Sequence, residues 1–85
     1  MSLFRILDNW FDYDNKKIKT GSEAHLFSCD EIWEVNYLKG KIKELYPYLN
    51  DGKILEAIEA CCRQVSAPRP RKIFVECVLS RLQLF

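Results

Sequence analysis

One histidine and four cysteines are the residues of this chain whose types are common in structural zinc sites. His25 and Cys29 lie four residues apart, whereas Cys61, Cys62 and Cys77 come much later. A structural zinc site usually takes its ligands from two closely spaced pairs, and this chain offers one loose pair. Neighbouring residues on a helix point about 100° apart, so Cys61 and Cys62 cannot easily reach the same ion. We therefore expect four buried, reduced thiols and no metal or other cofactor.

Cys29 is the candidate nucleophile, because it falls at the start of a predicted helix and a helix N-terminus favours the thiolate. His25 is the only histidine that could serve it as a base. The sequence contains neither a Gly-x-Ser-x-Gly elbow nor glycines at the spacing of a phosphate-binding loop. Glu31 and Glu34 also fall near this helix start, where a solvated carboxylate is favourable without any catalytic role. We therefore expect a protein that is not an enzyme.

A basic cluster of Arg69, Arg71 and Lys72 lies at the predicted start of the last helix. Two helices joined by a short connector could form a helix-turn-helix, whose second helix enters a groove of DNA. The last helix offers mostly apolar side chains, however, and the net charge of the chain is only +1. DNA-binding domains are commonly much more basic. Nucleic-acid binding through these three residues is therefore the alternative function.

Length and composition predict one small domain over residues 1–85. Hydrophobic residues make up 48% of the chain, which is enough for a core. No stretch approaches the roughly 18 apolar residues that cross a bilayer, and the first residues do not resemble a secretory signal. We expect a cytoplasmic protein whose thiols stay reduced, with no membrane partner and no small-molecule ligand.

Helical spacing of apolar residues predicts three helices, over 28–46, 51–65 and 70–83. Ser28 is the expected N-cap of the first, and Asn50 or Asp51 that of the second. Gly40 lies inside the first helix, where it either costs stability or marks close packing against another helix.

Residues 1–27 are compatible with two structures. Apolar residues at helical spacing favour a short helix that ends near Phe11 and is followed by a loop from Asp12. Two short strands joined near Asn15 are the alternative. The prediction is an all-α fold: a three-helix bundle with an additional N-terminal segment, a short helix or a hairpin, packed on it. The expected core is Leu7, Trp10, Trp33, Val35, Leu38, Ile42, Leu45, Ile54, Ile58, Cys61, Val65, Phe74, Cys77, Val78 and Leu82.

Two segments in the middle third of the chain carry a resemblance. Residues 30–38 read Asp-Glu-Ile-Trp-Glu-Val-Asn-Tyr-Leu, and residues 54–58 read Ile-Leu-Glu-Ala-Ile. Together they resemble a pattern in short bacterial helical proteins of unknown function, from which the adjacent cysteines and the Pro-Arg-Pro-Arg connector depart. The resemblance implies a helical fold and a bacterial source, and it implies no activity and no functional residues.

The last helix and the C-terminus carry more apolar side chains than a small interior is expected to hold. Val75, Leu79, Leu82 and Phe85 would form an apolar strip on this part of the chain. Large exposed apolar patches mark interaction sites. The leading hypothesis is therefore a non-enzymatic protein-interaction module that binds another protein or a second copy of itself through these four residues.

Overall fold

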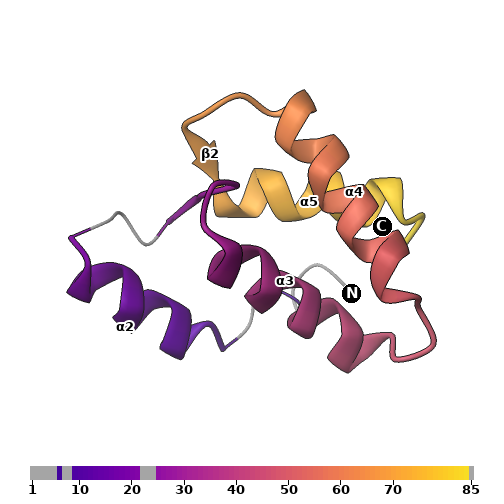
Figure 1. Cartoon of the computed structure of the whole chain (residues 1–85), viewed down its shortest axis with the longest axis horizontal. Helices are drawn as coiled ribbons and strands as arrows, with labels where there is room; N and C mark the ends of the chain where they lie inside the picture. The colour runs from indigo at the N-terminus through magenta and orange to yellow at the C-terminus, as the bar shows by residue number, and fades with distance from the viewer. Residues whose placement is uncertain (1–5, 7–8, 22–24, 85) are drawn as a thin grey trace.

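The computed structural model describes residues 6, 9–21 and 25–84, and within them the chain is mostly helical (Figure 1). No helix in this part of the chain is long and apolar enough to cross a membrane. The all-α class is thus confirmed, with one short two-stranded pairing added to it. In chain order the elements are α2 (Phe11–Lys19), β1 (Leu26–Phe27), α3 (Ile32–Leu45), α4 (Asp51–Gln64), β2 (Arg69–Pro70) and α5 (Arg71–Arg81).

The last two predicted helices, α4 and α5, begin and end within two residues of their predicted bounds. The side chain of Asn50 caps α4 by accepting a hydrogen bond from the Gly52 N–H at 2.7 Å, as predicted. Helix α3 begins at Ile32, four residues later than predicted. Its N-cap residue is Glu31 and not Ser28, so the predicted cap is wrong. The Ser28 N–H donates to the Glu34 carboxylate at 2.9 Å.

The residues just before Ser28 form strand β1, which pairs antiparallel with β2. Leu26 lies opposite Pro70 and Phe27 lies opposite Arg69. This pairing brings the connector between α4 and α5 against the segment that leads into α3. Two regions far apart in the sequence are thereby joined next to the start of α5 (Figure 1).

Helix α2 occupies the segment that was predicted to be a loop, so that prediction is wrong. The hairpin alternative is wrong too, because Asn15 lies in the middle of the helix. Its first turn carries Asp12 and Asp14 and its last turn carries lysines, an order that complements the helix dipole. Phe11, expected at the end of a packed N-terminal helix, is 70% exposed. Three apolar residues of that expected helix, Leu3, Phe4 and Leu7, lie outside the described residues.

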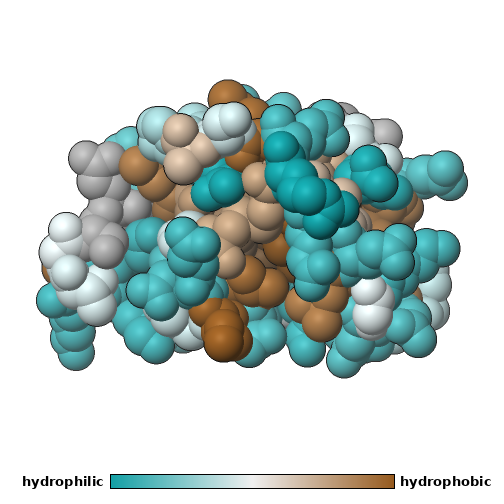
Figure 2. All heavy atoms as spheres, turned by 45° about the horizontal axis from the view of Figure 1, so that its top comes forward, coloured by the Kyte–Doolittle hydropathy of each residue, from teal (hydrophilic) through white to brown (hydrophobic). Residues whose placement is uncertain are grey.

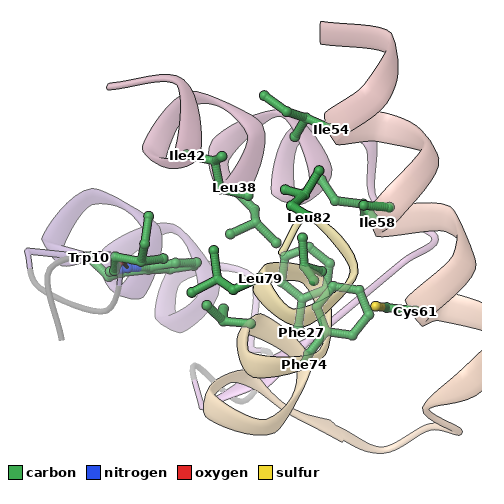
Figure 3. Close-up of a cluster of buried hydrophobic side chains, with 14 of the residues drawn as sticks. Trp10, Phe27, Leu38, Ile42, Ile54, Ile58, Cys61, Phe74, Leu79 and Leu82 are labelled. Atoms are coloured by element: carbon green, nitrogen blue, oxygen red, sulfur yellow. Dashed lines mark hydrogen bonds between the residues drawn. The ribbon is translucent and has the colours of Figure 1, made fainter. Parts of the chain in front are cut away.

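The core fills the space between α3, α4, α5 and β1 (Figure 3). The Phe27 and Phe74 rings stack at its centre, with their centroids 4.5 Å apart. Of the predicted core, the residues confirmed as buried are Trp10, Leu38, Ile42, Ile54, Ile58, Cys61, Phe74, Val78 and Leu82. Those that are only partly buried are Trp33, Val35, Leu45, Val65 and Cys77.

The predicted C-terminal binding strip is wrong for the three of its residues that are described. Val75 and Leu79 are fully buried and Leu82 is 8% exposed, while Phe85 lies outside the described residues. Helix α5 packs against α4 on one side and against β1 on another, so the domain covers both of its apolar flanks. These side chains therefore belong to the interior of the chain and offer no surface to a partner.

Candidate functional site

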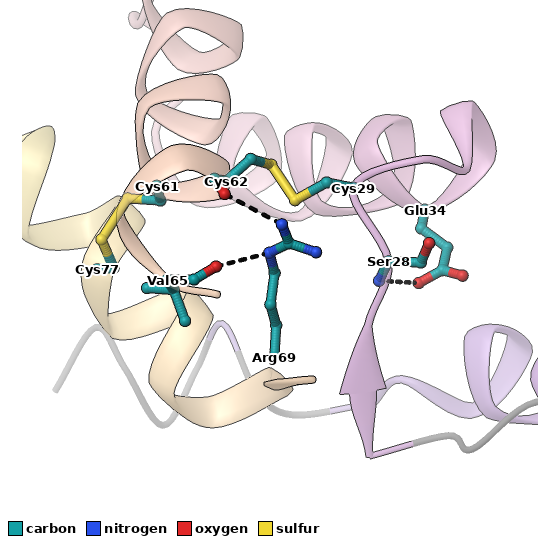
Figure 4. Close-up of a disulfide and its surroundings, with 8 residues drawn as sticks. All are labelled: Ser28, Cys29, Glu34, Cys61, Cys62, Val65, Arg69 and Cys77. Atoms are coloured by element: carbon teal, nitrogen blue, oxygen red, sulfur yellow. Dashed lines mark hydrogen bonds between the residues drawn. A yellow bond between two sulfur atoms is a disulfide. The ribbon is translucent and has the colours of Figure 1, made fainter. Parts of the chain in front are cut away.

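The four cysteines form two disulfides, so the prediction of reduced thiols is wrong for this structure (Figure 4). Cys29 is bonded to Cys62, with 6.1 Å between their Cα atoms, and Cys61 is bonded to Cys77, with 6.0 Å. Both separations are ordinary for disulfides. Adjacent side chains on a helix point in different directions, which argued against a shared metal ion. For the same reason Cys61 and Cys62 bond to different cysteines. That divergence was the sequence signal for two separate bonds.

These bonds alter the two chemical roles considered for Cys29. Its sulfur is bonded to that of Cys62, so it is neither a thiolate ligand nor a nucleophile in this state. Among the described residues, no group of three or more histidines, cysteines or carboxylates is placed to hold a metal ion.

The Arg69 side chain is used within the chain, at the C-terminal end of α4 (Figure 4). Its Nε donates to the Val65 carbonyl at 2.8 Å and its Nη2 donates to the Cys62 carbonyl at 3.0 Å. The last carbonyls of a helix lack partners within the helix, and a cation there also complements the helix dipole. Arg69 therefore fastens strand β2 to the end of α4.

Arg71 is also held by residues of this chain. Its Nη1 lies 2.7 Å from Oδ1 of Asp14, and its guanidinium lies 4.7 Å from the Trp10 ring centroid. The Arg71 N–H donates to the His25 carbonyl at 2.7 Å. Of the three basic residues predicted to meet nucleic acid, Lys72 is exposed and the other two are partly buried.

Helix α5 is unsuited to the role of a recognition helix. Four of its eleven residues are buried in the core, and its first turn follows directly on the β1–β2 pairing. A recognition helix must present a polar face of base-reading side chains to the groove. Two of the three cations at or just before its start, Arg69 and Arg71, bind other parts of the same domain instead.

A buried polar cluster, which sequence reasoning missed, joins α2 to α3. Both Glu34 and Lys17 are almost completely buried, and Lys17 Nζ lies 2.9 Å from Glu34 Oε2. The Tyr13 hydroxyl donates to Glu34 Oε1 at 2.5 Å, and the Ser28 N–H donates to the same oxygen. Burial, and next the hydrogen bond to Glu34, raise the pKa of Tyr13 well above its usual value. Glu34 was interpreted as a solvated residue of the first turn, which is wrong.

This cluster links α2 to α3 through hydrogen bonds and one ion pair. Each oxygen of Glu34 accepts at least one hydrogen bond, and no buried side-chain polar atom in the described part of the chain lacks a partner. A substrate would have to displace Lys17 or Tyr13 to reach the carboxylate. Helix α2, the residue that follows β1, and α3 meet at this single side chain.

Apolar side chains that remain at the surface are the other candidate for function. Figure 2 shows one face of the molecule, on which apolar residues are exposed in the middle and hydrophilic residues surround them. The most exposed large apolar residues described are Phe11, Ile18, Ile32, Tyr48 and Ile73. Two of them, Phe11 and Ile18, belong to the same helix, α2, and are 70% and 68% exposed.

No protein family, curated protein or solved structure matches this chain. Its function is therefore inferred from the geometry described above.

Proposed function

We propose that this chain is a non-enzymatic protein-interaction module that self-associates through the outer face of α2. The observation that supports the proposal is the exposure of Phe11 and Ile18. They stand seven residues apart, close to two full helical turns, so they share one face of the helix. The opposite face carries Tyr13 and Lys17, which are buried against the rest of the domain.

The charges beside this face are arranged to suit a second copy of the same chain. Asp12 and Lys19 are both exposed and also stand seven residues apart, on one flank of the Phe11–Ile18 face. In an antiparallel pair of α2 helices related by a two-fold axis, Phe11 of each copy faces Ile18 of the other. The same symmetry places each Asp12 near the other copy's Lys19.

The expected dimer is weak. A nine-residue helix offers much less than the roughly 800 Å² per partner of a standard interface. A Kd on the order of 0.1 mM is therefore expected. Self-association should be visible only at high protein concentration.

Sedimentation equilibrium between about 10 µM and about 2 mM, a range that brackets this Kd, tests the proposal. The native chain should shift from monomer to dimer, and Ile18→Asp should remain monomeric because a carboxylate would be buried against Phe11. Ile32→Asp is the matched control, because Ile32 is 77% exposed on another helix and its substitution should leave the dimer intact. A native chain that stays monomeric over the whole range would falsify the proposal.

A charge reversal tests the antiparallel arrangement separately. Asp12→Lys should weaken the dimer, because the new lysine would face Lys19 of the other copy. Adding Lys19→Asp in the same chain should restore it. Failure of the double variant to recover, while both variants keep the native helix content, would exclude this arrangement.

No observation favours the nucleic-acid alternative over this proposal, because Arg69 and Arg71 are bound within the domain. A cytoplasmic location, as expected from the sequence, belongs to the proposal as well. This location bears on the disulfides, because the thiols of a reducing compartment act on any disulfide that they can reach.

A further inference from the structure

The two disulfides differ in how far their cysteine residues are buried. Cys29 and Cys62 are both partly exposed. In the second bond Cys61 is fully buried in the core, and Cys77 lies at a groove of about 520 Å³ beside Val65. A thiol could therefore approach either end of Cys29–Cys62, but only the Cys77 end of the other bond.

The two bonds also differ in the thiolate that each would release. Attack on Cys77 must release the sulfur of Cys61 into apolar surroundings, which disfavour a thiolate. Attack on Cys29 releases the sulfur of Cys62, and Arg69 is bound to the carbonyl of that same residue (Figure 4). A guanidinium beside a cysteine favours the thiolate form. A better leaving group makes exchange faster.

We infer that Cys29–Cys62 is a thiol–disulfide exchange site for small dithiols, while Cys61–Cys77 keeps the core closed. One thiolate of the dithiol attacks Cys29 Sγ, and the Cys62 sulfur leaves with the electron pair of the old bond. The second thiolate then attacks the dithiol's own sulfur in the mixed disulfide and releases Cys29. The dithiol ends as a cyclic disulfide, and the protein gains two electrons and, from solvent, two protons.

The surrounding contacts would keep the reduced pair together. Arg69 still joins β2 to the end of α4 through its two hydrogen bonds, and Phe27 still pairs with Arg69 across the two strands. Cys29 follows Phe27 by two residues, so it stays close to Cys62 after the bond opens. An oxidised cyclic disulfide of the same dithiol class can then close the bond again by the reverse steps.

The experiment treats the oxidised full chain with dithiothreitol for varied times, followed by acid quenching and alkylation. The remaining disulfides are then reduced and alkylated with an isotopically heavy reagent. Trypsin places Cys29 in the peptide 20–39 and Cys77 in the peptide 73–81, so each peptide reports one bond. The first, isotopically light reagent should label Cys29 roughly tenfold or more faster than it labels Cys77. Equal rates, or faster labelling at Cys77, would overturn the inference.

Substitution of Arg69 tests its part in the exchange. Arg69→Gln should lower the ratio of the Cys29 rate to the Cys77 rate by roughly threefold or more, whereas Arg69→Lys, which keeps the charge, should largely preserve it. Arg63→Gln is the matched control, because it removes an exposed cation from the same end of α4. If Arg69→Gln loosened the whole fold, both peptides would label faster, which the Cys77 rate reveals. An unchanged ratio in Arg69→Gln would remove Arg69 from the mechanism.

Discussion

At the scale of single residues, the buried Glu34 carboxylate needs both a countercharge and hydrogen-bond donors from the rest of the domain. Glu34→Gln would keep its shape but leave the Lys17 ammonium buried without a countercharge. Breaking one half of a buried ion pair typically costs about 3–5 kcal/mol. We expect urea unfolding to show a loss of this size, and Glu31→Gln, at an exposed position of the same helix start, to change stability by less than about 0.5 kcal/mol.

A double variant separates the charge from the packing. Lys17→Met with Glu34→Leu removes both buried charges together, so it should recover most of the stability that Glu34→Gln loses. A double variant less stable than Glu34→Gln would mean that the hydrogen bonds from Tyr13 and Ser28, and not the unpaired charge, dominate the cost.

The same side chain shows what local sequence cannot predict. A glutamate in the first turn of a helix is favourable in water, so its local context contains no sign of burial. Its burial depends on Lys17, seventeen residues earlier, and on Tyr13. The cysteines were misinterpreted for a similar reason. Their types and spacing are compatible with thiols and with disulfides, and only the fold brings Cys29 beside Cys62.

At the scale of elements, Gly40 weakens helix α3 without any compensating contact. The sequence left open that it marks close helix packing, but a Cβ at this position would meet no heavy atom within 4 Å. Gly40→Ala should therefore stabilise the protein by about 0.5–1 kcal/mol, measured by urea unfolding. Gly52→Ala is the contrasting variant, because its Cβ would lie 3.0 Å from the Asn50 Oδ1 that caps α4. If Gly40→Ala brought no gain, the helix would be limited by something other than propensity.

The elements that could be predicted are those with strong signals at their ends. Asn50 caps the start of α4, and the two prolines of the following connector separate this helix from α5. The bounds of both helices were therefore predicted to within two residues. Helix α2 was missed because polar residues such as Asp12 and Asn15 are as common in turns as at helix starts. Its apolar anchor is Tyr13, whose burial depends on α3. Contacts between segments, and not local preference, decide this part of the fold.

At the scale of the whole molecule, the predicted binding strip is wrong because other segments of the chain cover these apolar residues of α5. Phe27 was not assigned to the core, yet its ring stacks on Phe74 of α5 and strand β1 closes that side of the helix. The three described residues of the predicted strip, Val75, Leu79 and Leu82, are therefore buried inside the domain. Among the residues that the structure describes, the large apolar ones that remain exposed are spread over several elements, and only α2 carries two on one face.

Both disulfides meet on α4, and together they tie the turn before α3 and the middle of α5 to that one helix. The bonds span 33 and 16 residues, for which loop-closure entropy gives contributions of about 4 and about 3 kcal/mol. Their sum is comparable to the whole stability of many small domains, which is about 5–15 kcal/mol. Full reduction should therefore lower the Tm by tens of degrees, measured by far-UV circular dichroism with and without excess reductant.

The double variant Cys29→Ser with Cys62→Ser distinguishes loss of one tie from loss of both. It should remain folded at 25 °C, because the other disulfide, the β1–β2 pairing and the Arg69 hydrogen bonds are all retained. Helix α2, which no disulfide reaches, is fastened by Lys17 and Asp14 in either state. A fully reduced native chain with an unchanged Tm would show that side-chain packing alone holds α3, α4 and α5 together, and that neither bond is needed for the fold.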